Sequence, residues 1–72
     1  MFYVFTVAKL DKYENNINNE GIENLSKELF DNYENIKNEI IKKSKTIKEE
    51  NVYKFIDKNR NLIYLIHPLS LW

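Results

Sequence analysis

The sequence contains no cysteine, and glycine, proline and histidine occur once each. The absence of cysteine excludes disulfides, thiolate zinc sites and a cysteine nucleophile. With Gly21 as the only glycine, no glycine-rich loop can cradle a phosphate. Because His67 is the only histidine, a histidine-based metal site would need carboxylates or a second copy of the chain. We therefore expect no cofactor and no metal.

The remaining side chains do not form a recognisable catalytic motif. The candidate nucleophiles would all need His67 as their base, and no motif surrounds His67. These nucleophiles are Ser26, Ser44, Ser70 and the threonines. Three acidic residues, Glu28, Asp31 and Glu34, could bind a divalent ion. On a helix, however, such a set is more typical of a solvated face. We expect the protein not to be an enzyme.

Charge and size limit the class of protein further. The 72 residues include 11 basic and 11 acidic side chains, and zero net charge disfavours a general polyanion binder. No apolar run approaches the ~20 residues of a membrane span, and residues 2–8 lack the basic flank of a signal peptide. The abundance of Asn, Ile and Lys is typical of AT-rich genomes. We expect one domain, 1–72, in the cytoplasm of a bacterial or archaeal host.

The hydrophobic pattern predicts an α+β fold in the order β-α-β-β. Aromatic and β-branched runs predict strands, whereas apolar residues spaced by three or four from Ile22 onward predict one long amphipathic helix. The predicted segments are a strand at 2–8, a loop at 9–20 with room for a short helical turn, a helix at 22–50, a hairpin at 52–57 and 62–67, and an apolar tail at 68–72. Asn residues in the hairpin loop tolerate positive φ.

The last strand is expected to lie in the centre of a small three-stranded antiparallel sheet. Residues 62–66 carry no charge, whereas 52–57 includes Lys54, a common residue of edge strands. This places the strands in the order 1-3-2, with the long helix packed on one face. Pro68 cannot donate to a ladder and is expected to end the last strand.

This predicted fold has more apolar surface than one helix can cover. A helix over 22–50 would be about 43 Å long, whereas a seven-residue strand spans about 23 Å, so the helix would overhang the sheet. The excess surface could be covered by the loop and tail, or could form a dimer seam or a partner site. The candidate interface residues are Tyr3, Phe5, Phe30, Tyr33, Ile36, Ile40, Ile41, Tyr53, Phe55 and Trp72.

Charge along the predicted helix is segregated, with acids in the first half and lysines in the second. This pattern complements the helix macrodipole, and it would also let two copies pack antiparallel as a homodimer. The basic stretch could instead bind nucleic acid, with sheet aromatics stacking on bases. Its residues are Lys42, Lys43, Lys45 and Lys48.

These patterns favour a homodimeric, non-enzymatic protein-interaction domain. The expected partner is a larger host protein such as a nuclease or another defence effector. Small cysteine-free proteins of phages and mobile elements, anti-CRISPR proteins among them, often block such targets. The alternatives are a small nucleic-acid-binding or regulatory protein that uses the basic stretch, and a structural subunit or antitoxin that is stable only in its complex.

Overall fold

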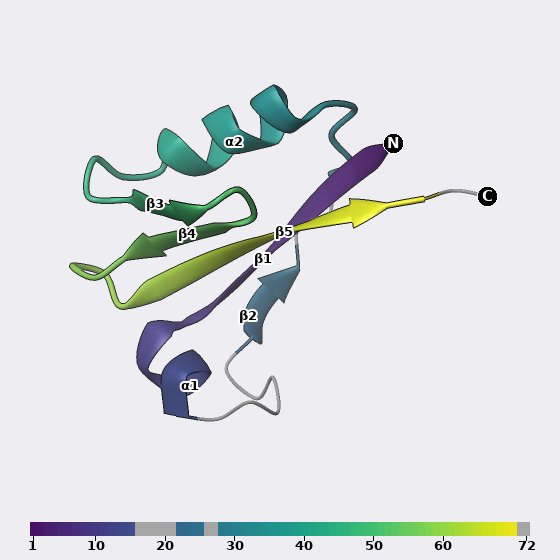
Figure 1. Cartoon of the computed structure of the whole chain (residues 1–72). Coiled ribbons are helices and arrows are strands. Elements are labelled where there is room, and N and C mark those ends of the chain that lie inside the picture. The colour runs from purple at the N-terminus through teal and green to yellow at the C-terminus, as the bar shows by residue number, and fades with distance from the viewer. Residues whose placement is uncertain (16–21, 26–27, 71–72) are drawn as a thin grey trace.

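The computed structural model describes residues 1–15, 22–25 and 28–70, which form one antiparallel sheet and two short helices (Figure 1). The elements are β1 (Phe2–Lys9), α1 (Leu10–Asn15), β2 (Ile22–Leu25), α2 (Tyr33–Ile41), β3 (Lys48–Asn51), β4 (Lys54–Asp57) and β5 (Leu62–Leu69). No helix in the described part of the chain is long and apolar enough to cross a membrane.

The sheet has the strand order β2-β1-β5-β4-β3, and every neighbouring pair is antiparallel. β1, β5, β4 and β3 form its body, and the four-residue β2 extends it beyond β1. β5 runs past Pro68 because the opposite residue, Tyr3, exchanges its backbone hydrogen bonds with Phe30 instead, at 2.9 and 3.0 Å. The expectation that Pro68 ends this strand is therefore wrong.

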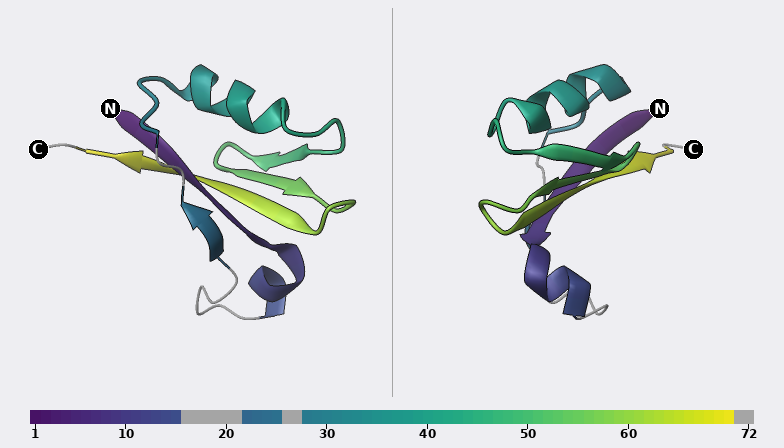
Figure 2. Two further views of the ribbon diagram at one scale, coloured as in Figure 1. Left: turned by 180° about the vertical axis from the view of Figure 1, so that it is seen from behind. Right: turned by 60° about the vertical axis from the view of Figure 1, so that its left-hand side comes forward.

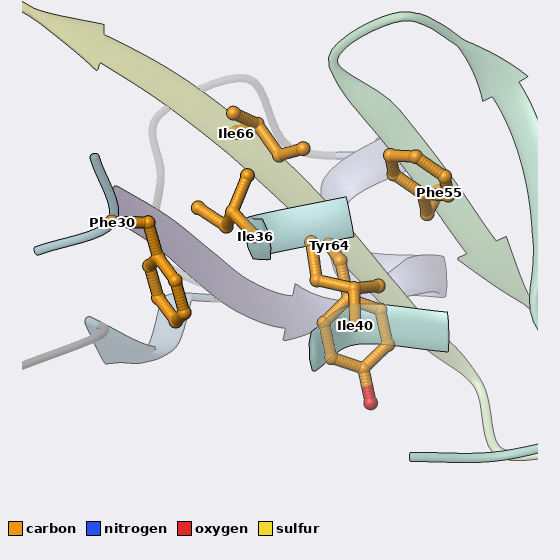
Figure 3. Packing of buried hydrophobic residues seen from close by; sticks show 6 residues of the cluster. All are labelled: Phe30, Ile36, Ile40, Phe55, Tyr64 and Ile66. Carbon is orange, nitrogen blue, oxygen red and sulfur yellow. The ribbon is translucent and has the colours of Figure 1, made fainter. Parts of the chain in front are cut away.

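The two helices lie on opposite faces of the sheet (Figure 2). Ile36 and Ile40 of α2 have no exposed surface and point toward the strand residues of the larger core cluster (Figure 3). That cluster consists of Phe30, Ile36, Ile40, Phe55, Tyr64 and Ile66. On the other face, Leu10 at the start of α1 packs with Ala8 and Ile63. The start of α1 therefore covers part of the sheet face that lies opposite α2.

The prediction of one long helix over 22–50 is wrong. Residues 22–25 form β2, and helix α2 begins only at Tyr33, after Asn32 caps it by accepting a 2.8 Å hydrogen bond from the Asn35 N–H. After Ile41 the chain turns, and Ile47 reaches the core from a non-helical segment. The three-and-four spacing thus runs through several elements and does not mark one helix; Ile36 and Ile40 of α2 and Ile47 of the following loop reach the same core.

The three-stranded sheet in the order 1-3-2 is also wrong, because two further strands, β2 and β3, form its edges. β3 has the sequence Lys-Glu-Glu-Asn, and all four residues are exposed. It therefore shows no alternation of apolar and polar residues by which a strand could be recognised. The expected overhang does not exist either, since α2 has only nine residues.

Substitutions of two neighbouring isoleucines near the end of α2 test which side of the helix faces the sheet. Ile40 is fully buried and Ile41 is 42% exposed. We expect Ile40→Ala to lower the free energy of unfolding by about 2–5 kcal/mol, because it leaves a cavity, and Ile41→Ala to lower it by less than about 1 kcal/mol. Urea denaturation followed by circular dichroism measures both values. Equal losses would contradict the packing of α2.

Candidate functional site

The structure separates the candidate interface residues into buried and exposed groups. Phe30, Ile36, Ile40 and Phe55 are at most 8% exposed and belong to the core, where Phe5 packs against them. The side chains of these four core residues pack within the fold and leave little surface for a partner. Ile41 is exposed at the end of α2, and Trp72 lies outside the described residues.

The other three candidates, Tyr3, Tyr33 and Tyr53, lie side by side and are called here the tyrosine cluster. The rings of Tyr3 and Tyr33 meet edge to face with centroids 6.2 Å apart, and those of Tyr33 and Tyr53 do so at 6.4 Å. Separations of this size and this geometry are favourable for aromatic pairs. The three rings come from β1, α2 and the turn between β3 and β4, so the sheet order and the position of α2 bring them together.

Several exposed apolar residues belong to the segments that carry this cluster. Large apolar residues that are exposed in the described part of the chain are Met1 (73%), Leu29 (53%), Ile41 (42%), Val52 (54%) and Tyr53 (45%). Met1 is two residues from Tyr3, Leu29 precedes the Phe30 that pairs with Tyr3, and Val52 precedes Tyr53. The start of β1, the start of α2 and the β3–β4 turn lie toward the same end of the molecule in Figures 1 and 2.

Hydrogen bonds fix the centre of the cluster and leave its outer hydroxyls available. The Tyr33 hydroxyl donates to the Val52 carbonyl oxygen at 2.5 Å, and the Asn51 side chain accepts from the Tyr53 N–H at 2.9 Å. Partial burial and the nearby Glu49 carboxylate raise the pKa of Tyr33, which keeps this donor protonated at neutral pH. Among the described residues, the hydroxyls of Tyr3 and Tyr53 have no hydrogen-bond partner. They could bond to a partner without breaking an internal contact.

The basic stretch does not form one continuous surface. Lys42 Nζ pairs with Glu39 Oε1 at 2.6 Å, and Lys43 Nζ lies 5.6 Å from the centroid of the Phe5 ring. Lys45 and Lys48 lie further along the chain and line a separate pocket. The sheet aromatics proposed to stack on bases are also divided, because Phe55 and Tyr64 are buried under α2.

The residues considered for catalysis or metal binding are not brought together. His67 Nε2 hydrogen-bonds Thr6 Oγ1 at 2.9 Å across the sheet, and Ser44 hydrogen-bonds Thr46. Asp31 accepts from Asn35 Nδ2 at 3.2 Å. Among residues 1–15, 22–25 and 28–70, no three His, Asp or Glu side chains come close enough to hold a metal ion. Ser26 lies outside the described residues.

Asp57 is a buried charge that the sequence did not single out. Its side chain is fully buried at the end of β4, and its Oδ1 accepts from Thr46 Oγ1 at 2.6 Å and from the Arg60 N–H at 3.2 Å. Its Oδ2 has no hydrogen-bond partner in the described structure. Burial acts to raise the pKa of Asp57, but the hydrogen bonds from Thr46, Arg60 and Ser44 and the positive charge of Arg60 together outweigh it, so the pKa lies below its ordinary value.

Comparison of the chain with protein-family models, with curated proteins and with solved structures gave no match.

The lowered pKa of Asp57 makes stability depend on pH. The carboxylate stabilises the folded state above its unfolded pKa of about 3.9, and this contribution is lost as pH falls through the lower folded value. We expect the unfolding free energy to fall more between pH 7 and pH 3 in the wild type than in Asp57→Asn, which keeps the shape without the charge. Urea titrations at each pH measure the difference.

The matched control is Glu50→Gln, which removes an exposed carboxylate seven residues away. It should leave the pH dependence close to that of the wild type. A pH dependence that is identical in Asp57→Asn and the wild type would show that Asp57 contributes nothing to it.

Proposed function

We propose that this chain is a non-enzymatic protein-interaction domain that docks on a larger protein through the tyrosine cluster and the exposed residues Met1, Leu29 and Val52. The observation that carries the proposal is that the segments that carry three contacting tyrosines also carry the exposed apolar residues Met1, Leu29 and Val52. Tyrosine is enriched at binding hot spots because a rigid ring buries much area and its hydroxyl adds a directional bond.

Several features favour a protein over a nucleic acid as the partner at this site. The tyrosine rings meet edge to face, so they do not present a row of parallel faces to successive bases. The nearby Lys37 Nζ is paired with Glu49 Oε1 at 3.3 Å. An apolar surface beside paired charges is typical of the centre and rim of a protein interface.

The kind of target follows from size and composition. A domain of 72 residues with no cofactor-binding motif acts most simply by occupying a surface of its target. We propose a phage or mobile-element inhibitor of the anti-CRISPR type, which blocks a host nuclease or another defence effector in the cytoplasm of a bacterium or archaeon. The AT-rich composition supports this source.

The proposal predicts that Tyr53→Ala disrupts partner binding while leaving the fold intact. Tyr53 is 45% exposed, so truncation leaves no cavity in the core. The expected loss is at least about 30-fold in Kd, which corresponds to a hot-spot residue of about 2 kcal/mol. Tagged wild type, Tyr53→Ala and Ile41→Ala are used as baits in the same host lysate, and the retained protein is purified for calorimetric titration.

Ile41→Ala is the matched control, because Ile41 is exposed to a similar degree but lies away from the cluster. A partner that binds both variants as tightly as the wild type, or a wild-type bait that retains no protein, would contradict the proposal. Light scattering distinguishes a homodimer interface from an interface with another protein. Twice the chain mass of 8.7 kDa, reduced to one chain by Tyr53→Ala, would assign the cluster to a homodimer instead.

The nucleic-acid alternative has a different signature. It requires binding that weakens steeply with salt and is abolished by charge reversal at Lys42, Lys43, Lys45 and Lys48. That result together with unchanged binding by Tyr53→Ala would replace the protein-docking proposal.

A further inference from the structure

A pocket of about 590 Å³ lies at the other end of the β3–β4 hairpin from Val52 and Tyr53. Its volume is within the range of about 300–1,000 Å³ that small-molecule sites occupy. Three segments form its wall: the loop before β3, β3 with β4, and the turn after β4. The lining residues are Lys45, Thr46, Lys48, Glu49, Glu50, Ile56, Lys58 and Asn59.

Positive charge dominates the wall of this pocket. Lys45, Lys48 and Lys58 form no ion pair within the described part of the chain. The Glu49 carboxylate pairs with Lys37 of α2. Glu49 lies opposite Phe55 in the sheet, and Phe55 packs in the core under α2. Among the described lining residues, three ammonium groups and one carboxylate, that of Glu50, therefore form no ion pair. This excess of cations in a concave site attracts anions.

Asp57 holds the two sides of the pocket in place. Its Oδ1 accepts from Thr46 in the loop that carries Lys45, and from the N–H of Arg60 in the turn that carries Lys58. One buried carboxylate oxygen thus ties together the two segments of the chain that carry Lys45 and Lys58. A site that is ordered before binding loses less entropy when the ligand arrives.

We infer that this pocket binds the phosphate groups of a small phosphorylated molecule. Lys45, Lys48 and Lys58 would donate charge-assisted hydrogen bonds to the phosphate oxygens, and the half-buried Ile56 offers an apolar floor for the rest of the ligand. The same chemistry could come from a nucleic-acid backbone. The surroundings of the pocket favour a small molecule, because the lysines that would extend a basic track beyond it are engaged elsewhere: Lys42 pairs with Glu39, and Lys43 lies against the Phe5 ring.

The test is an NMR titration of the intact chain with inorganic pyrophosphate, compared with a single-stranded oligonucleotide. Saturable amide shifts confined to residues 45–50 and 56–59 are expected with pyrophosphate. The double variant Lys48→Gln/Lys58→Gln should bind it at least roughly tenfold more weakly. The matched control Lys42→Gln/Lys43→Gln removes the same charge outside the pocket and should retain the affinity.

Three results would overturn the inference: no saturable shifts with pyrophosphate, equal weakening in both double variants, or tighter oligonucleotide binding that is lost in the Lys42/Lys43 control. Because this site is separate from the tyrosine cluster, Lys48→Gln/Lys58→Gln should still bind the protein partner as the wild type does. Failure of one proposal is thereby distinguished from failure of the other.

Discussion

The burial of Ile36 and Ile40 against the sheet sets the position of α2, and with it the positions of Tyr33 and of the loop that follows the helix. Both side chains are fully buried in the cluster that includes Phe55 and Tyr64 (Figure 3). Their packing holds α2 across the sheet, and this position brings Tyr33 into contact with Tyr3 and Tyr53. It also sets where the chain leaves the helix, so that the following loop can reach Asp57 through Thr46.

The sequence was informative where a segment is buried and misleading where a pattern spans several elements. The three apolar segments do form β1, β4 and β5, because strands in the middle of a sheet contact apolar groups on both faces. The spacing of apolar residues from Ile22 onward mimics a helix, although β2, α2 and the following loop share it. Asn32 inside this run was the available sign of a new helix start, since Asn is a preferred N-cap.

The sequence identified the three tyrosines of the candidate site, but it did not show that they contact one another or that Val52 is exposed. Tyr3, Tyr33 and Tyr53 were recognised as candidates, but their contact depends on α2 ending early and on an unrecognised strand, β3. Val52 was missed because it was assigned to a strand. The Asn51 side chain accepts from the Tyr53 N–H, which is a local turn signal readable from the sequence. Asp57 has a similar signal, since it accepts from the N–H of Arg60 three residues later.

β3 connects the two proposed sites and is poorly suited to be an interface through its own edge. Lys48 lines the pocket, Glu49 pairs with α2, and Asn51 supports the turn of the tyrosine cluster. The strand is short, charged and irregular between Glu49 and Asn51, which are features that protect sheet edges from pairing. Antiparallel pairing of two copies would also set glutamates opposite each other, and like charges in that position are destabilising. Association through this edge is therefore disfavoured.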